Sequence, residues 1–190
     1  MISPARNSFQ DEDCILEPVE DFSVFDGFSC GDDDLDDFIA NDARPHQEKL
    51  LAVTYSFRLK QGDKVSEPVA YVSLLNDSVR HLTTSRKKKK FPRDKRYKEF
   101  PAVKIGRLAV KKPYLQHGIG KHLVTILKEL FVTSNRTGCR FMTVDAYRNA
   151  IGFYEKNDFD FVLPKEKESD LKTVSMYFDL MRFKAFREAQ

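Results

Sequence analysis

The sequence predicts a single domain of the α/β class, of the α+β type, with a mixed central sheet of six to seven strands flanked by helices. Three observations lead to this prediction. The chain has 190 residues, 41% of them hydrophobic, which is enough for one domain with its own core. Its first half holds two neighbouring apolar segments typical of a hairpin. Its second half alternates strand, helix, strand, helix and strand patterns, which favours a partly parallel sheet.

The first half supplies three strands and a helix. Residues 14–19 (CILEPV) have the apolar character of a first strand. Residues 31–43 open with acidic side chains, of which Asp32 or a neighbour can cap a helix, and apolar residues then recur at helical spacing. Segments 50–59 and 68–76 are apolar, β-branched and aromatic, and the polar KQGDK lies between them. They are therefore predicted to form a hairpin.

The middle of the chain predicts a strand, a turn and a long helix. Residues 102–110 (AVKIGRLAV) have the character of a buried strand, and Pro113 ends it because proline cannot donate to a ladder. From Gly118 onward, apolar residues recur at helical spacing: Ile119, Leu123, Ile126, Leu127, Leu130 and Phe131. Asn135 and Gly138 suit the exit of this helix.

The C-terminal part completes the alternating pattern. Residues 139–146 (CRFMTVDA) predict a strand, and residues 149–156 (NAIGFYEK) predict a short helix. Segments 159–163 and 173–181 predict the final two strands. We therefore expect one domain over residues 1–190.

Composition excludes several classes of protein. The chain has no run of 18 apolar residues, so no membrane-spanning helix is expected. The first 14 residues lack the basic and apolar regions of a secretory signal. Cys14, Cys30 and Cys139 are widely spaced and odd in number, so they predict neither a disulfide framework nor a metal site. We expect a cytoplasmic protein without a metal.

The positive charge of the chain is local. Residues 80–99 contain ten lysines and arginines against two acids, whereas the whole chain carries a net charge of only +3. This segment is predicted to be a basic loop inserted in the domain. Such a charge attracts nucleic acid, and Phe91 and Tyr97 can stack on bases. A solvated loop without a ligand is the alternative.

A glycine-rich stretch stands at the start of the long helix. In YLQHGIGKHLV, residues 114–124, Gly118 and Gly120 leave the backbone open to an anion at the positive end of the helix. A Walker A loop requires glycine where Leu115 stands, and a dinucleotide fingerprint requires glycine where Leu123 stands. The stretch therefore predicts a phosphate-bearing ligand of another kind, or a plain turn from strand to helix.

Two linked motifs narrow the choice. IGRLAV, residues 105–110, directly precedes the glycine stretch, and NAIGFYEKNDF, residues 149–159, follows about 25 residues later. Together they resemble the GNAT superfamily of N-acetyltransferases, over roughly residues 68–163. The chain departs from the family pattern at Leu115, where arginine or glutamine is usual, and at Asn157-Asp158, where the family has glycine.

The resemblance implies a GNAT-like fold, acetyl-CoA as the cofactor and direct transfer in a ternary complex. It implies that backbone groups at one strand end pair with the pantetheine arm, and that Asn149 contacts the pantetheine amides. These strand residues are Leu108, Ala109 and Val110. The amides of the turn are implied to hold the diphosphate. These turn residues are Gln116, His117, Gly118, Ile119, Gly120 and Lys121.

The resemblance makes Tyr154 the candidate catalytic residue. A phenol with a pKa near 10 can give a proton to a thiolate with a pKa near 8.5. The general base is open, because the strand 102–110, where many GNAT enzymes carry a glutamate, has no acid. Asp77, His81 and a water relay are the alternatives.

The expected reaction is acetyl transfer from acetyl-CoA to a primary amine. At neutral pH, deprotonating a lysine amine costs about 4–5 kcal/mol, and an α-amine costs about 1 kcal/mol. FSCGDDDLDDFI, residues 28–39, resembles the opening of toxin-type GNAT proteins, so the α-amine of aminoacyl-tRNA is a candidate acceptor. RNA contact through the basic loop, a homodimer and an antitoxin are then candidate partners. The alternative is a non-catalytic module that binds acyl-CoA or nucleic acid.

Overall fold

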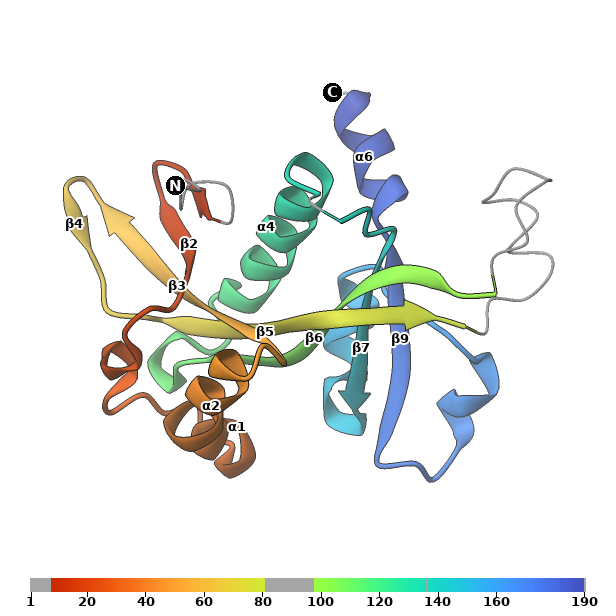
Figure 1. Cartoon of the computed structure of the whole chain (residues 1–190), viewed down its shortest axis with the longest axis horizontal. Helices are drawn as coiled ribbons and strands as arrows, with labels where there is room; N and C mark the ends of the chain where they lie inside the picture. The colour runs from red at the N-terminus through yellow and green to blue at the C-terminus, as the bar shows by residue number, and fades with distance from the viewer. Residues whose placement is uncertain (1–7, 81–97, 136, 190) are drawn as a thin grey trace. The chain divides into compact units, whose positions relative to one another are not determined.

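The computed structural model describes residues 8–80, 98–135 and 137–189 (Figure 1). Most of the predicted basic loop, including His81, Phe91 and Tyr97, lies outside the described residues. The chain divides into two compact units. The first unit consists of residues 1–75 and 105–135, and the second of residues 76–104 and 136–190. Each unit is described by itself, and the single domain over residues 1–190 stays a prediction.

The first unit is built on strands, and those from β1 to β5 pair antiparallel. In sheet order they are β1 (Phe9–Gln10), β2 (Cys14–Pro18), β3 (Val53–Gln61), β5 (Ala70–Val79) and β6 (Phe100–Val110), and β4 (Lys64–Val65) pairs with β3. β5 and β6 each extend into the second unit. The predicted hairpin is confirmed, because β3 and β5 pair antiparallel with Tyr55 opposite Val72.

The predicted helix at residues 31–43 exists and runs further than expected. It consists of α1 (Asp33–Asp37), a π-helical turn (Phe38–Asp42) and α2 (Ala43–Glu48). Asp32 caps it as predicted, since its carboxylate accepts a hydrogen bond from the Leu35 amide at 3.1 Å. Pro45 has no amide to donate and its ring crowds the preceding turn. The wide π turn directly before α2 accommodates this proline.

The core of the first unit packs this helical segment against β5. Phe25, Phe38 and Ile39 are buried around Tyr71, which has no exposed surface. The rings of Phe25 and Phe28 meet Tyr71 edge to face, at centroid distances of 5.8 and 5.5 Å. The Tyr71 hydroxyl donates to the Leu35 carbonyl at 2.7 Å. The buried phenol therefore has the hydrogen-bond partner that burial requires.

The long helix and the turn before it follow the sequence closely. α4 (Ile119–Thr133) buries one apolar face: Leu123, Val124, Ile126, Leu127 and Leu130. This is the face that the helical spacing predicted. Between β6 and α4, a short 3₁₀ helix (Lys112–Tyr114) contains Pro113, where the strand was expected to end.

The second unit contains the remaining strands. In sheet order they are the ends of β5 and β6, then β7 (Phe141–Tyr147), β9 (Thr173–Asp179) and β8 (Asp160–Phe161). Helical segments follow the strands: a 3₁₀ turn (Arg148–Ala150), α5 (Ile151–Lys156), a second 3₁₀ helix (Pro164–Glu168) and α6 (Leu180–Glu188). The rings of Phe100 and Tyr177 pack edge to face on Phe141, at centroid distances of 6.2 and 5.7 Å, in the core of this unit.

The predicted class is confirmed, and three details change. Within the described residues the sheet has nine strands and not six to seven. The two extra strands, β1 and β4, have two residues each, which is too short for an alternating pattern to be recognised. The last predicted strand, 173–181, ends at Asp179, and α6 follows although no helix was expected there. Asp179 caps α6 by accepting from the Met181 amide at 3.2 Å.

Buried thiols predict how stability responds to alkaline pH. Burial raises the pKa of Cys139 from 9.0 to about 11. Between these values the unfolded chain has lost the thiol proton and the folded chain has kept it, so raising the pH favours unfolding. The free energy of unfolding, measured by urea denaturation, is expected to fall as the pH rises from about 9 to 11. Cys139→Ala should make this decline shallower, and an unchanged slope would contradict the assignment.

Candidate active site

The turn before α4 holds its backbone in a conformation suited to an anion. Gln116 has a φ of 64° and Gly118 has a φ of 80°, so two left-handed residues flank His117. Left-handed backbone costs an ordinary residue about 1–2 kcal/mol, and such strain is typical of functional sites. When right-handed and left-handed backbone conformations alternate along the chain, successive N–H groups point to the same side. They then form a concave site that binds an anion.

The start of α4 adds its own unpaired amides. Gly118 is the N-cap residue, and no side chain within the described part of the chain caps this helix. The first amides of a helix lack partners within it and carry a partial positive charge. Lys121 is exposed, and it adds a positive charge in the first turn of α4. The combination fits a diphosphate group.

His117 belongs to the turn and not to a catalytic pair. Its Nδ1 lies 2.8 Å from the Leu115 carbonyl oxygen. Because a carbonyl can only accept, Nδ1 carries the hydrogen and donates it. The ring is exposed and braces the backbone of the turn.

The predicted pantetheine strand segment lies at the end of β6. Ala109 is buried in the core of the first unit, whereas Leu108 and Val110 are half-buried. The side chains thus alternate as a strand requires, and the predicted backbone contacts stay a prediction. Packing explains the glycine at position 106, since a Cβ there would lie 2.7 Å from Leu75 Cδ2.

Tyr154 and Asn149 belong to the second unit. Tyr154 on α5 is 6% exposed, and its ring contacts Phe153 and Phe159 at centroid distances of 5.0 and 5.3 Å. Burial raises the pKa of Tyr154 above its ordinary value, so the phenol is protonated at neutral pH. Asn149 is exposed in the 3₁₀ turn before α5. The glycine turn therefore belongs to the first unit, and Tyr154 belongs to the second.

α5 ends at Asn157 and Asp158, where the chain departs from the family pattern. Asp158, where the family has glycine, adopts a φ of 65°. Aspartate tolerates left-handed backbone better than most residues. Asn157 closes the helix, because its side-chain amide donates to the Phe153 carbonyl at 2.8 Å.

Arg148 fixes the loop that follows α5. Its guanidinium donates to the backbone carbonyls of Leu171 at 2.8 Å, Lys167 at 2.9 Å and Glu166 at 3.1 Å. It also donates to the Ser169 carbonyl and hydroxyl. A guanidinium presents five donors in a rigid fork, so this one residue holds the whole loop. Arg148 directly precedes Asn149 and therefore anchors one end of the motif that contains Tyr154.

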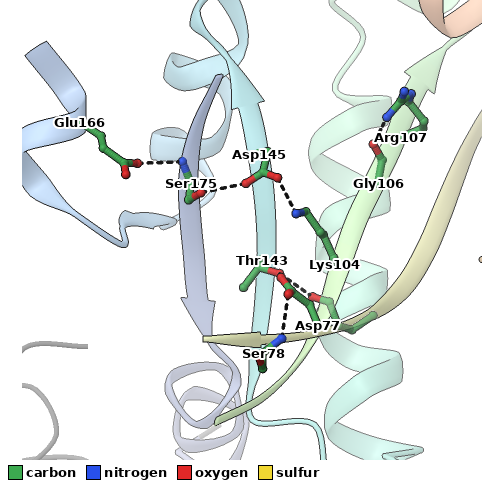
Figure 2. Close-up of polar contacts among 10 residues, drawn as sticks. Asp77, Ser78, Lys104, Gly106, Arg107, Thr143, Asp145, Glu166 and Ser175 are labelled. Atoms are coloured by element: carbon green, nitrogen blue, oxygen red, sulfur yellow. Dashed lines mark hydrogen bonds and ion pairs between the residues drawn. The ribbon is translucent and has the colours of Figure 1, made fainter. Parts of the chain in front are cut away.

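Asp77, one of the alternatives for the base, accepts two hydrogen bonds in the second unit (Figure 2). The Thr143 hydroxyl donates to its Oδ2 at 2.6 Å, and the Ser78 amide donates to its Oδ1 at 2.7 Å. These contacts fix the carboxylate between β5 and β7. Thr143 was missed from the sequence, where the only sign was a polar residue inside an apolar strand pattern.

A second carboxylate on β7 is also held by neighbours (Figure 2). Asp145 forms an ion pair with Lys104 and accepts from the Ser175 hydroxyl at 2.8 Å. The Ser175 amide in turn donates to Glu166 at 3.2 Å. The two aspartates are thus oriented polar groups on β5 and β7, the strands on either side of β6.

A scan against models of protein families matches part of the chain. Residues 93–180 match the model described as an acetyltransferase (GNAT) domain. A search of curated proteins by sequence found no match.

Solved structures with the same fold include proteins named KacT and AtaT. A tyrosine-to-phenylalanine mutant of KacT has a TM-score of 0.70 at 20% identity, with 92% of this chain and 99% of that chain covered. AtaT complexed with acetyl-methionyl-tRNA has a TM-score of 0.71 at 20% identity, with 92% and 99% covered. A mutant AtaT toxin bound to the C-terminus of the antitoxin AtaR and acetyl-CoA has a TM-score of 0.66 at 19% identity, with 93% and 98% covered.

The fold and the family match confirm the resemblance predicted from the two motifs. The matched residues, 93–180, resemble an acetyltransferase (GNAT) domain, and the solved structures show that the chain has the same fold. Among the helices of the described residues, none combines the length and the apolar character needed to cross a membrane. The predicted homodimer stays a prediction.

Proposed function

We propose that this protein transfers an acetyl group from acetyl-CoA to the α-amine of aminoacyl-tRNA, by direct attack in a ternary complex. One observation carries the proposal most strongly. It is the strained turn from Gln116 to Gly118 that leads into the uncapped start of α4. This backbone offers several converging amides to a diphosphate, and coenzyme A contains one.

The proposal gives each site residue a role. The amides of Gln116 to Lys121 bind the diphosphate, and Lys121 adds a cation. Backbone groups of Leu108 to Val110 pair with the pantetheine arm as an added strand does, and Asn149 contacts its amides. When bound, acetyl-CoA supplies an activated thioester. Tyr154 gives its proton to the departing thiolate.

The missing acid on β6 supports an acceptor with a low pKa. The strand Phe100–Val110 contains no aspartate or glutamate, so it offers no carboxylate to take the proton of a lysine amine. An α-amine with a pKa of about 8 is deprotonated at a cost of about 1 kcal/mol at neutral pH, against about 4–5 kcal/mol for lysine. Asp77 is held by Thr143 and Ser78 and is the candidate group to receive the remaining proton, directly or through water.

The proposed partners follow from the acceptor. The basic segment 80–99 is proposed to attract the phosphates of tRNA, because its ten cations face only two acids. Structures with the same fold include AtaT with an acetylated aminoacyl-tRNA and AtaT with the antitoxin AtaR. An antitoxin is therefore proposed as a protein partner of this chain.

Acetylation of charged tRNA tests the proposal. The full chain is incubated with labelled acetyl-CoA and a set of tRNAs, each charged with its amino acid, and the amino acids are then released by mild base and analysed. We expect label on the α-nitrogen of at least one amino acid. Uncharged tRNA and free amino acids serve as controls and should stay unlabelled, because they lack either the amine or the tRNA.

Two outcomes would contradict the proposal in different ways. If no charged tRNA accepts label while a small amine or a protein amine does, the acceptor is wrong and the acyltransferase activity stands. If nothing accepts label and acetyl-CoA still binds, the alternative of a non-catalytic binding module is favoured.

A further inference from the structure

Three side chains that commonly bind metal ions meet in the first unit, although they are far apart in the sequence. Asp11 lies in the turn between β1 and β2, Cys14 is the first residue of β2, and His122 lies in the first turn of α4. One ligand atom from each lies within 4.8 Å of the other two. Cys14 is fully buried, and the other two residues are exposed, so the group is open to water on one side.

The spacing of these atoms fits a tetrahedral zinc ion. The Cys14 Sγ and the His122 Nε2 are 3.6 Å apart. Zinc bonds of about 2.3 Å to sulfur and about 2.0 Å to nitrogen, at a tetrahedral angle, place the two ligand atoms about 3.5 Å apart. A hydrogen bond between thiol and imidazole also spans this distance. The carboxylate of Asp11 beside both atoms favours the metal, because it supplies a third ligand.

The surrounding contacts hold the three side chains in place. The Asp11 Oδ1 accepts hydrogen bonds from the amides of Asp13 at 2.9 Å and Cys14 at 2.8 Å. Lys60 Nζ donates to the Asp11 carbonyl at 2.8 Å, which ties the turn to β3. The ring of His122 packs on Phe57 at a centroid distance of 5.8 Å. Ligands oriented by such outer contacts are typical of metal sites.

We propose that Asp11, Cys14 and His122 bind one Zn²⁺ ion, with water as the fourth ligand. Sulfur, nitrogen and carboxylate oxygen are the ligands that zinc uses in proteins, and a thiolate with imidazole disfavours magnesium and calcium. Binding replaces the proton on the Cys14 sulfur, which leaves to solvent. The two charges of the ion balance those of the thiolate and the carboxylate, so the buried sulfur anion is compensated.

The position of the site gives the ion a structural consequence. His122 directly follows Lys121, the last residue of the turn proposed to bind diphosphate. A zinc ion joins the start of β2 to the first turn of α4, and thereby restrains that turn. The ion takes no part in the transfer itself, and the site does not depend on the proposed acceptor.

Cobalt titration of the full chain, purified without a histidine tag, tests the site directly. Co²⁺ bound to a thiolate gives a strong near-ultraviolet charge-transfer absorption, and we expect this band to saturate at one equivalent. One equivalent of Zn²⁺ should remove it. Cys14→Ser should abolish the band, and His122→Gln should weaken cobalt binding at least tenfold.

Matched variants separate this site from other thiols and imidazoles. Cys30→Ser and His117→Gln remove one thiol and one imidazole elsewhere in the same unit, and both should keep the band. Because Cys14 is buried, its variant can lose the fold. His122→Gln and Asp11→Asn change exposed residues, and in them Zn²⁺ should no longer raise the melting temperature as it does in the unaltered chain.

Two results would overturn the proposal. The first is the absence of a cobalt band in the unaltered chain, which would leave the hydrogen bonds of Cys14 with His122 and Asp11 as the reason for the cluster. The second is a band that persists unchanged in Cys14→Ser, or a zinc-induced rise in melting temperature that persists in His122→Gln, since the metal would then bind elsewhere.

Discussion

Replacing Tyr154 with phenylalanine is expected to lower the turnover rate of acetyl transfer by 10²- to 10⁴-fold, the usual contribution of a positioned acid. The phenol has a pKa of at least about 10 and a thiol about 8.5, so the proton transfer is uphill by at least about 2 kcal/mol. Without the phenol, the sulfur leaves as an unprotonated thiolate, which raises the barrier to transfer. Steady-state kinetics with saturating acetyl-CoA, together with calorimetric binding of the cofactor, measures the effect.

The variant should leave binding and folding nearly intact. The contacts of Tyr154 with Phe153 and Phe159 are made by its ring, which phenylalanine retains. Tyr177→Phe is the matched control, because it removes a hydroxyl from another buried tyrosine of the same unit and should not change turnover. Equal loss of turnover in both variants, or none in Tyr154→Phe, would show that Tyr154 is not the acid.

Replacing Gly118 with alanine should weaken acetyl-CoA binding about tenfold. Nothing lies within 4 Å of a Cβ built at Gly118, so the effect is not a steric clash. It arises from the φ of 80°, which costs an alanine about 1–2 kcal/mol. Relief of this strain rotates the amides that are proposed to face the diphosphate, and about 1.4 kcal/mol of lost binding energy is a tenfold change in Kd.

Gly62 provides the control for this variant. It lies in the turn between β3 and β4 with a φ of 61°, and it also has nothing within 4 Å of a built Cβ. Gly62→Ala therefore imposes a similar backbone strain away from the proposed site. It should lower the free energy of unfolding by about as much as Gly118→Ala does and leave the Kd of acetyl-CoA unchanged. Equal Kd values of acetyl-CoA for the two variants would show that the turn is not part of the binding site.

The fold was predictable where one face of an element is buried. The helical spacing from Ile119 to Leu130 predicted α4, because every turn of that helix places an apolar side chain on the same buried face. The β3–β5 hairpin was predictable for a similar reason, since both strands are apolar and a polar turn separates them. Asp32 was recognisable as a cap from its place before the first apolar helical residue.

Other elements depend on contacts that the local pattern does not contain. α6 has a weak division into apolar and polar faces and exposes Met181 and Phe186, so its sequence (LMRFKAFRE) gives no clear helical period. The π turn before α2 is an adjustment to Pro45 that spacing alone does not specify. Strands of two residues, such as β1, form only because a longer neighbour offers its edge.

The candidate site was predictable only where its residues form local motifs. The glycine turn and the segment around Tyr154 are continuous in sequence, so the resemblance to GNAT proteins identified both. The contact of Asp77 with Thr143 joins residues 66 positions apart, and the contact of Cys14 with His122 joins residues 108 positions apart. Such pairs are made by the fold, and the spacing of cysteines and histidines along the chain does not predict them.

A crystal structure of the protein with acetyl-CoA tests the central claim most directly. The account predicts diphosphate oxygens within hydrogen-bond distance of the amides of Gly118 to Lys121, and the thioester sulfur within hydrogen-bond distance of the Tyr154 hydroxyl. A coenzyme bound elsewhere with this turn empty, or a sulfur atom far from Tyr154, would contradict it.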